Sequence, residues 1–149
     1  MVKISFMNKT LVSIIALACL ALASCDDQPV PVAEVPQDIQ VFIQQNFVGS
    51  TMTYAQRDLG LLGWEYDVTL SDGTIVKFDS DHMWDQVSCA AASVPAALVP
   101  APIATYLNAN FPGVAITKID KESNGYDVDL ASGLELKFNS QGALMEMDD

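Results

Sequence analysis

Residues 66–78 read YDVTLSDGTIVKF, and this stretch predicts a β-hairpin. Apolar side chains alternate with polar ones on both sides of residues 71–73, which is the pattern of two strands with one buried face. A three-residue loop with Gly73 in the left-handed conformation pairs Val68 with Val76 and keeps the apolar residues on one face. A two-residue loop would mix the two faces, so we predict the three-residue loop.

A second copy of this hairpin occurs at residues 126–138, which read YDVDLASGLELKF. Upstream of the two hairpins, residues 35–47 and 99–111 also align without a gap, and both carry apolar side chains at helical spacing. Similarity at a fixed period indicates a repeated structural unit. We therefore interpret the chain as two tandem units, at residues 36–92 and 93–149.

Each unit is predicted to be a helix followed by four antiparallel strands. Beside the two hairpins, further strands are expected near residues 51–57, 83–88, 115–121 and 143–147. The predicted fold class is α+β, a tandem repeat of a helix followed by a four-stranded antiparallel sheet, with the helices packed on one sheet face. One unit is small for a stable core, so we expect the two units to pack together or to extend one sheet.

The N-terminal residues 1–24 have the layout of a lipoprotein signal peptide. Lys3 and Lys9 precede or flank an apolar run of about a dozen residues, shorter than the roughly 20 that span a bilayer as a helix. The sequence Leu-Ala-Ser-Cys that ends at Cys25 resembles the bacterial lipobox, which makes Cys25 the predicted lipidation site. An ordinary signal peptide cut before this cysteine is the alternative. Residues 25–35 are expected to form a flexible, solvated tether.

Charge and cysteine content restrict the classes of partner. The whole chain has a formal charge of −12, and the part after the signal has −14, from five Lys or Arg and nineteen Asp or Glu. Such a surface repels nucleic acid and anionic lipid, so we predict no nucleic-acid partner and membrane contact through the lipid anchor only. After processing and lipidation only Cys89 retains a thiol, which we expect to be buried rather than reactive.

The sequence predicts neither an enzyme nor a cofactor. The single histidine, His82, aligns with Gly142 of the second unit, which indicates a turn position rather than a general base. A calcium loop of the helix-loop-helix type starting at Asp79 would need glycine and glutamate where the chain has Trp84 and Ala90. No phosphate-binding glycine loop or zinc-type spacing occurs. A weak divalent-cation site at this acidic hairpin is the alternative that remains.

Outward-facing residues of the predicted hairpins define a candidate binding face. Asp67 is expected opposite Lys77, and Asp127 opposite Lys137. The complete candidate face consists of Asp67, Ile75, Lys77, Asp85, Val87, Asp127 and Lys137, with Ile75 and Val87 as an apolar patch. Such a face either keeps the protein soluble or recognises a cationic or polar partner. The same register directs both tryptophans, Trp64 and Trp84, toward the core.

Together these motifs resemble the PepSY-like family of bacterial envelope proteins. The resemblance rests on Asn-Phe at the helix ends, Tyr-Asp-Val-x-Leu, a glycine turn, and Lys-Phe-Asp or Lys-Phe-Asn. That family is similar in fold to the beta-lactamase inhibitor protein and is common in Bacteroidetes as secreted or lipid-anchored proteins. The resemblance implies a non-enzymatic protein at the outer membrane, on its periplasmic face or at the cell surface, that binds an envelope protein or peptide. Inhibition of a peptidase or other envelope hydrolase is the alternative. The chain departs from the family pattern at His82 and in the longer turn of residues 58–63.

Overall fold

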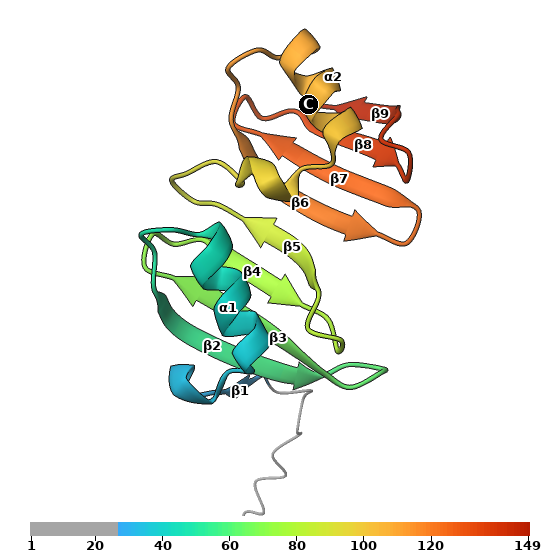
Figure 1. The fold of residues 1–149 in the computed structure, drawn as a ribbon. Helices are drawn as coiled ribbons and strands as arrows, with labels where there is room; N and C mark the ends of the chain where they lie inside the picture. Colours follow the sequence, from blue (N-terminus) through green and yellow to red (C-terminus); the bar gives the residue numbers. More distant parts are fainter. Residues whose placement is uncertain (1–26) are drawn as a thin grey trace, which may run out of the picture.

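The computed structural model describes residues 27–149, which form one antiparallel sheet of nine strands with two α-helices (Figure 1). Neighbouring strands in the sheet are also neighbours in the chain. The strands are β1 (Gln28–Pro29), β2 (Met52–Leu59), β3 (Trp64–Leu70), β4 (Ile75–Phe78), β5 (Trp84–Ser88), β6 (Ile116–Glu122), β7 (Gly125–Leu130), β8 (Glu135–Asn139) and β9 (Leu144–Asp148). Short 3-10 helices, η1 (Val32–Glu34) and η2 (Ala96–Leu98), precede the α-helices α1 (Gln37–Asn46) and α2 (Ala101–Asn110).

The predicted fold class is wrong, because the strands do not form a four-stranded sheet in each unit. β5 pairs with β6 and places Val87 opposite Ile119, so a single sheet continues through the whole described chain. Two separate sheets would leave two more strands with unpaired backbone N–H and C=O groups, and the β5–β6 pairing removes both of these edges. The one strand beyond the eight predicted is β1, and it comes from the segment that we expected to be a tether.

The first described residues are held against the sheet. Gln28 pairs with Arg57 on β2, and the Val30 N–H donates to the Ala55 carbonyl over 2.9 Å. Val35, just after η1, is only 3% exposed. The described part of this segment is therefore ordered and partly buried, unlike the solvated tether that its polar composition predicted.

Both hairpins have the predicted register. Val68 pairs with Val76 between β3 and β4, and Val128 pairs with Leu136 between β7 and β8. Gly73 has a φ of 85°, the left-handed conformation that the three-residue loop requires. The alternation of apolar and polar residues therefore correctly identified the two faces of these four strands.

The core lies on one face of the sheet, the inner face, and both helices cover it (Figure 1). Phe42 of α1 meets Phe78 edge-on with ring centroids 5.4 Å apart, and Tyr106 of α2 meets Phe138 in the same way at 5.6 Å. Directly paired residues point to the same face, and one such row runs across the sheet. Its members are Ala55, Val68, Val76, Val87, Ile119, Val128, Leu136 and Met147, of which all but Met147 are at most 1% exposed.

Bulges shift the alternation of side chains in several strands. Between β4 and β5 the register changes at Lys77 and Phe78, and Asp85 is left without a partner on β4. An extra residue of this kind reverses the alternation beyond it. Trp84 and Val87 consequently both point to the inner face, at 9% and 0% exposure. The predicted outward position of Val87 is wrong for this reason.

The α-helices begin where their prolines predict. Pro36 and Pro100 are the residues immediately before α1 and α2, where the missing proline N–H costs no intrahelical hydrogen bond. α2 starts at Ala101, within the range that the sequence predicted. Each helix has ten residues, and within residues 27–149 no helix has the length and apolar composition needed to cross a membrane.

Candidate binding face

The sheet face opposite the helices, the outer face, carries two cross-strand rows of residues. The first row is Gln56, Asp67, Lys77, Gln86, Asp120, Asp127, Lys137 and Glu146. The second row is Tyr54, Thr69, Ile75, Ser88, Lys118, Asp129, Glu135 and Asp148. Seven of these sixteen residues are acids and three are lysines, so the outer face is net negative.

In the first half of the sheet the polar residues bind one another. Lys77 Nζ lies 3.4 Å from Asp67 Oδ2, as expected for predicted cross-strand neighbours. Gln56 Nε2 donates to Asp67 Oδ2 over 3.5 Å and to Asp27 Oδ2 over 3.0 Å. Partly exposed ion pairs of this kind contribute at most about 1 kcal/mol to stability. The lysine in this half is thus already matched by a carboxylate.

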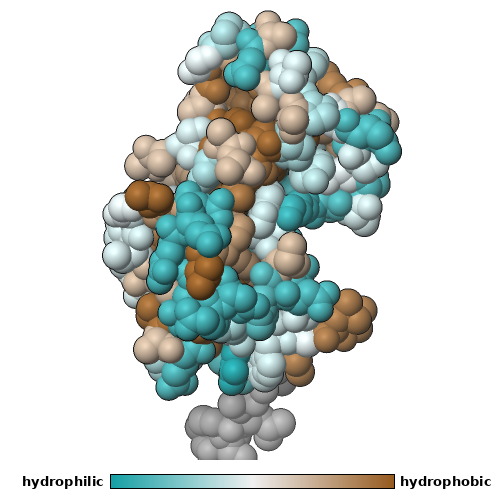
Figure 2. Space-filling model, in the orientation of Figure 1, coloured by the Kyte–Doolittle hydropathy of each residue, from teal (hydrophilic) through white to brown (hydrophobic). Residues whose placement is uncertain are grey.

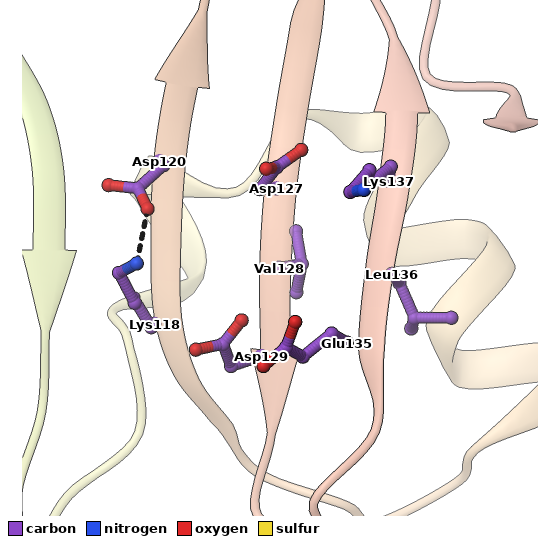
Figure 3. Close-up of a pocket in the computed structure, with 8 residues that line it drawn as sticks. All are labelled: Lys118, Asp120, Asp127, Val128, Asp129, Glu135, Leu136 and Lys137. Carbon is purple, nitrogen blue, oxygen red and sulfur yellow. Dashed lines mark ion pairs between the residues drawn. The ribbon is translucent and has the colours of Figure 1, made fainter. Parts of the chain in front are cut away.

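In the second half, acids outnumber lysines around a shallow cavity of about 100 Å³, the acidic cavity (Figure 3). Its charged lining consists of Lys118, Asp120, Asp127, Asp129, Glu135 and Lys137. Figure 3 shows these side chains projecting from β6, β7 and β8 on the same face, with an ion pair between Lys118 and Asp120. Asp120 lies directly opposite Asp127, and Asp129 directly opposite Glu135. Like charges directly opposite in a sheet are destabilising.

The surroundings of Asp129 raise its affinity for a proton. Burial is the main cause that raises the pKa of the Asp129 carboxyl, and the charges of Glu135, Asp120 and Asp127 raise it further. Lys118, directly opposite Asp129 on β6, has the largest charge effect and lowers the pKa of Asp129, but its ammonium donates a hydrogen bond to Asp120, which raises the pKa of Lys118. Asp129 is therefore a carboxylate that the nearby lysine only partly compensates.

Lys137 also leaves its predicted partner incompletely neutralised. It lies opposite Asp127 on β7, as the register predicted. Its Nζ, however, is 2.8 Å from Glu146 Oε2 on β9, and this hydrogen bond raises the pKa of Lys137 and lowers that of Glu146. The lysine is shared among more acids than one charge can balance, so the cavity keeps an excess of negative charge.

The other predicted face residues do not form the expected apolar patch. Ile75 is 38% exposed on the outer face, but Val87 is fully buried on the inner face. Asp85, the bulge residue, is half-buried, and burial is the first cause and Asp79 the second that raise its pKa. Its Oδ1 is buried without a hydrogen-bond partner among the described residues. The structure therefore keeps Ile75 on the face and removes Val87 from it.

A lysine that we did not single out joins the two halves of the sheet. Lys121 on β6 donates from Nζ to the Trp84 carbonyl on β5 over 2.8 Å, and the same atom lies 3.6 Å from the Trp84 ring centroid. Burial lowers the pKa of Lys121, against the opposing charges of Asp79 and Asp85. The contact joins residues 37 positions apart on strands assigned to different units, and no local pattern predicted which strands of the two units would pair.

His82 occupies the turn between β4 and β5, as predicted, with a φ of 60°. Its ring also makes contacts that the aligned glycine lacks. Nδ1 lies 2.8 Å from Asp38 Oδ2 on α1, and the ring is edge-on to Tyr66 at 5.5 Å. The hydrogen bond with His82 is the main cause that lowers the pKa of Asp38. We conclude that His82 ties the turn to the first helix.

Three further predictions concern thiols, metals and the lipid anchor. Cys89 is buried, as expected, and burial raises the pKa of its thiol. Among residues 27–149 no group of three or more His, Cys, Asp or Glu side chains is placed to hold a metal ion. The predicted lipidation site, Cys25, and the signal peptide lie outside the described residues.

Comparison with known proteins relates this fold to periplasmic proteins. A crystal structure from Bacteroides thetaiotaomicron, described as a "putative calcium-regulated periplasmic protein", is 35% identical, with a TM-score of 0.77 over 83% of this chain and 98% of that chain. Two proteins of Bacteroides vulgatus, also described as periplasmic, are 32% and 29% identical at the same TM-score and cover 83% of this chain. They are aligned over 98% and 100% of their own lengths.

No protein of curated function matches this chain. Periplasmic relatives agree with a place in the cell envelope, and neither they nor the matching family point to catalysis. The family model described as "Putative beta-lactamase-inhibitor-like, PepSY-like" matches residues 64–146, more than half of the chain. The chain therefore belongs to the PepSY-like family.

Proposed function

We propose that this protein is a lipid-anchored, non-enzymatic envelope protein that binds a basic segment of another protein or peptide through its outer face. The observation that carries the proposal is the acidic cavity, where two cross-strand pairs of acids face each other. A lysine or arginine side chain of a partner would relieve the repulsion within these pairs and form charge-assisted hydrogen bonds. The negative charge of the acidic cavity is thus less well neutralised in the free protein than it would be in a complex.

The dimensions favour a macromolecular partner over a small ligand. The acidic cavity has a volume of about 100 Å³, whereas pockets for small molecules usually have about 300–1,000 Å³. The first outer row spans eight strands, which at about 4.8 Å per strand is about 34 Å along the sheet. This is enough for a protein surface or an extended peptide, with the cavity accepting one basic side chain.

The lipid anchor rests on the lipobox-like residues that end at Cys25, and the periplasmic relatives support an envelope location. The Cys25→Ser variant should fold but appear in the soluble envelope fraction, because it lacks the acyl chains that hold it to a membrane. A variant that stays fully membrane-bound would contradict lipidation at this residue.

Calcium is a natural competitor to include in the binding measurements, since one relative is described as calcium-regulated. We assign the acidic cavity to a cation of a protein partner and not to a metal ion. Under this assignment, millimolar calcium weakens partner binding only to the extent that an equal ionic strength of sodium chloride does.

Inhibition of an envelope peptidase or other hydrolase is the alternative, and the description of the family favours it. The two functions differ in one outcome. An inhibitor lowers the turnover of the bound enzyme, with half-inhibition at the concentration where binding is half-complete. A binding module of another kind leaves the partner's activity unchanged.

The test places a photo-crosslinking residue at Ser88, which lies opposite Lys118 on the outer face and carries no charge, or at Gln44 on the exposed side of α1, in the full chain in its native envelope. We expect a defined product from position 88 and none from position 44. The product should then be lost in the Asp129→Asn variant but kept in Glu34→Gln, which removes the same charge from η1. Equal yields from both positions, or a product insensitive to Asp129, would refute binding at the acidic cavity.

A further inference from the structure

The β2–β3 hairpin ends in three exposed leucines. Leu59, Leu61 and Leu62 are 66%, 98% and 85% exposed, and they form the leucine tip. Figure 2 shows a hydrophobic knob on the lower right of the molecule, where Figure 1 has the end of this hairpin. The equivalent hairpin between β6 and β7 needs no such residues, since Glu122 pairs with Gly125 across a short polar turn. The fold therefore does not require the leucines.

The chain enters the sheet beside this tip. β1 runs antiparallel to β2 with Gln28 opposite Arg57, two residues before Leu59, so its N-terminal end points toward the leucine tip. Cys25 precedes Gln28 by three residues, a length of chain that reaches about 11 Å at most. Lipid on Cys25 would accordingly hold the leucine tip within reach of the bilayer surface.

We propose that the leucine tip inserts into the surface of the membrane that anchors the protein, so that the anchor and the tip together fix its orientation. The inference deepens the proposed function, because it rests on the lipid anchor at Cys25. Three leucines bury too little apolar surface to hold the protein alone, but a short tether keeps their effective concentration at the bilayer high. The lipid chains supply the attachment, and the leucine tip supplies a second point of contact, in addition to the anchor that the charge of the chain led us to expect as the only contact with the membrane.

The base of the tip suits a shallow position at the water interface. The guanidinium carbon of Arg57 lies 4.3 Å from the ring centroid of the half-buried Trp64, and amphipathic side chains of both types are common where apolar and aqueous regions meet. Asp58 and Glu65 lie opposite each other at the same level. Their charges limit insertion to the leucines and favour net-neutral lipid over anionic lipid.

The experiment attaches the chain to vesicles chemically, so that it does not depend on processing in the cell. A hexahistidine segment replaces residues 1–25 and binds nickel-chelating lipid in phosphatidylcholine vesicles. An environment-sensitive fluorophore is placed on Leu61→Cys, or on Val48→Cys as the control. Val48 is 88% exposed and precedes β2, at the opposite end of that strand from the tip, while the native Cys89 is buried and protected from labelling.

We expect the label at position 61, and not the label at 48, to shift to shorter wavelength on attachment and to lose at least about half its emission to nitroxide-labelled lipid, as an inserted group does. Leu59→Ser with Leu62→Ser should reduce this quenching several-fold without changing the thermal midpoint, since both side chains are exposed. Replacing half of the phosphatidylcholine by phosphatidylglycerol should reduce it as well.

A water-exposed label at position 61 on attached protein would overturn the proposal, and so would equal responses at positions 48 and 61. A response that appears only after another envelope protein is added would assign the leucines to a protein contact instead. Failure of the lipid anchor itself is read separately, from the fractionation of Cys25→Ser, because the vesicle assay replaces Cys25.

Discussion

Neutralising one pair of facing acids should stabilise the protein and weaken its binding to a basic partner. Asp129 and Glu135 are direct cross-strand partners, and Lys118, which lies opposite Asp129 on β6, forms its ion pair with Asp120. Like charges in this arrangement cost roughly 0.2–1 kcal/mol. We expect Asp129→Asn or Glu135→Gln to raise the free energy of unfolding by this amount, or about 1–5 °C in the thermal midpoint for a domain of this size.

A double-mutant cycle measures the repulsion directly. The two single variants and the double variant are unfolded with urea at neutral pH, first at low salt and then in about 1 M sodium chloride, where the Debye length falls to about 3 Å. At low salt the double variant should gain less than the sum of the single variants, because either substitution already removes the repulsion. In high salt the coupling should shrink toward zero.

The contribution of Asp129 to the stability of the protein should fall as the pH rises. The pKa of Asp129 is raised in the folded protein, so folding favours its protonated form. The stability that this group contributes is complete below its unfolded pKa, about 3.9, and is lost as the pH rises through the raised folded value. Asp129→Asn should remove this part of the pH dependence, which is measured by unfolding between about pH 3 and 7.

The matched control is Asp67→Asn. It removes an acid of the first outer row that forms an ion pair with Lys77. It should leave stability unchanged or lower it slightly. If Asp129→Asn lowered stability, or if the coupling were absent at low salt, the cavity would hold no uncompensated charge, and our reason for placing a basic partner there would fail.

Three other experiments test separate parts of the structure. Val87→Ala should lower the free energy of unfolding by about 2–3 kcal/mol, because Val87 is fully buried. Ile75→Ala should lower it by less than about 1 kcal/mol, because Ile75 is exposed on the outer face. Urea unfolding of both variants tests whether the bulge in β5 turns Val87 toward the core. Cys89 should react with a maleimide only as fast as the protein opens, since burial raises the pKa of its thiol, and rapid labelling measured by mass spectrometry would contradict this. His82→Gly relieves a left-handed backbone but loses the bond to Asp38, so the net change should stay within about 1 kcal/mol. The Asp38 pKa should rise in this variant, by NMR titration, and an unchanged value would argue against the bond.

Local patterns predicted the elements of this fold better than their assembly. The Gly73 turn and the pairing of Val68 with Val76 follow from alternation and from left-handed geometry, both of which act over a few residues. The pairing of Val87 with Ile119 spans the connection through η2 and α2, and no local pattern distinguishes it from two separate sheets. β1 was missed because two residues are too short for alternation to be visible.

The candidate face was predicted only in part, for a similar reason. Asp67, Lys77, Asp127 and Lys137 lie within hairpins whose register the turns determine, and all four are on the outer face. The bulge at β5 carries no sequence signal that we recognised, and it moved Val87 to the core. The alternation that identified Asp127 also places Asp129 and Glu135 on the outer face. That these two acids are only partly neutralised became apparent from the structure, in which Lys118 is paired with Asp120 and Lys137 with Glu146.

The leucine tip and the acidic cavity should act independently, because the sheet separates them. Leu61 belongs to the loop after β2, and the cavity begins at β6, four strand spacings or about 19 Å along the sheet. This distance exceeds the Debye length of about 8 Å at physiological salt, so the cavity acids neither assist nor hinder the approach of the tip to lipid. Asp129→Asn should accordingly change partner binding and leave the position of the tip unaltered, whereas Leu59→Ser with Leu62→Ser should do the reverse. An effect of either change in both assays would mean that lipid and partner compete for one surface, and the two proposals would then have to be merged into one.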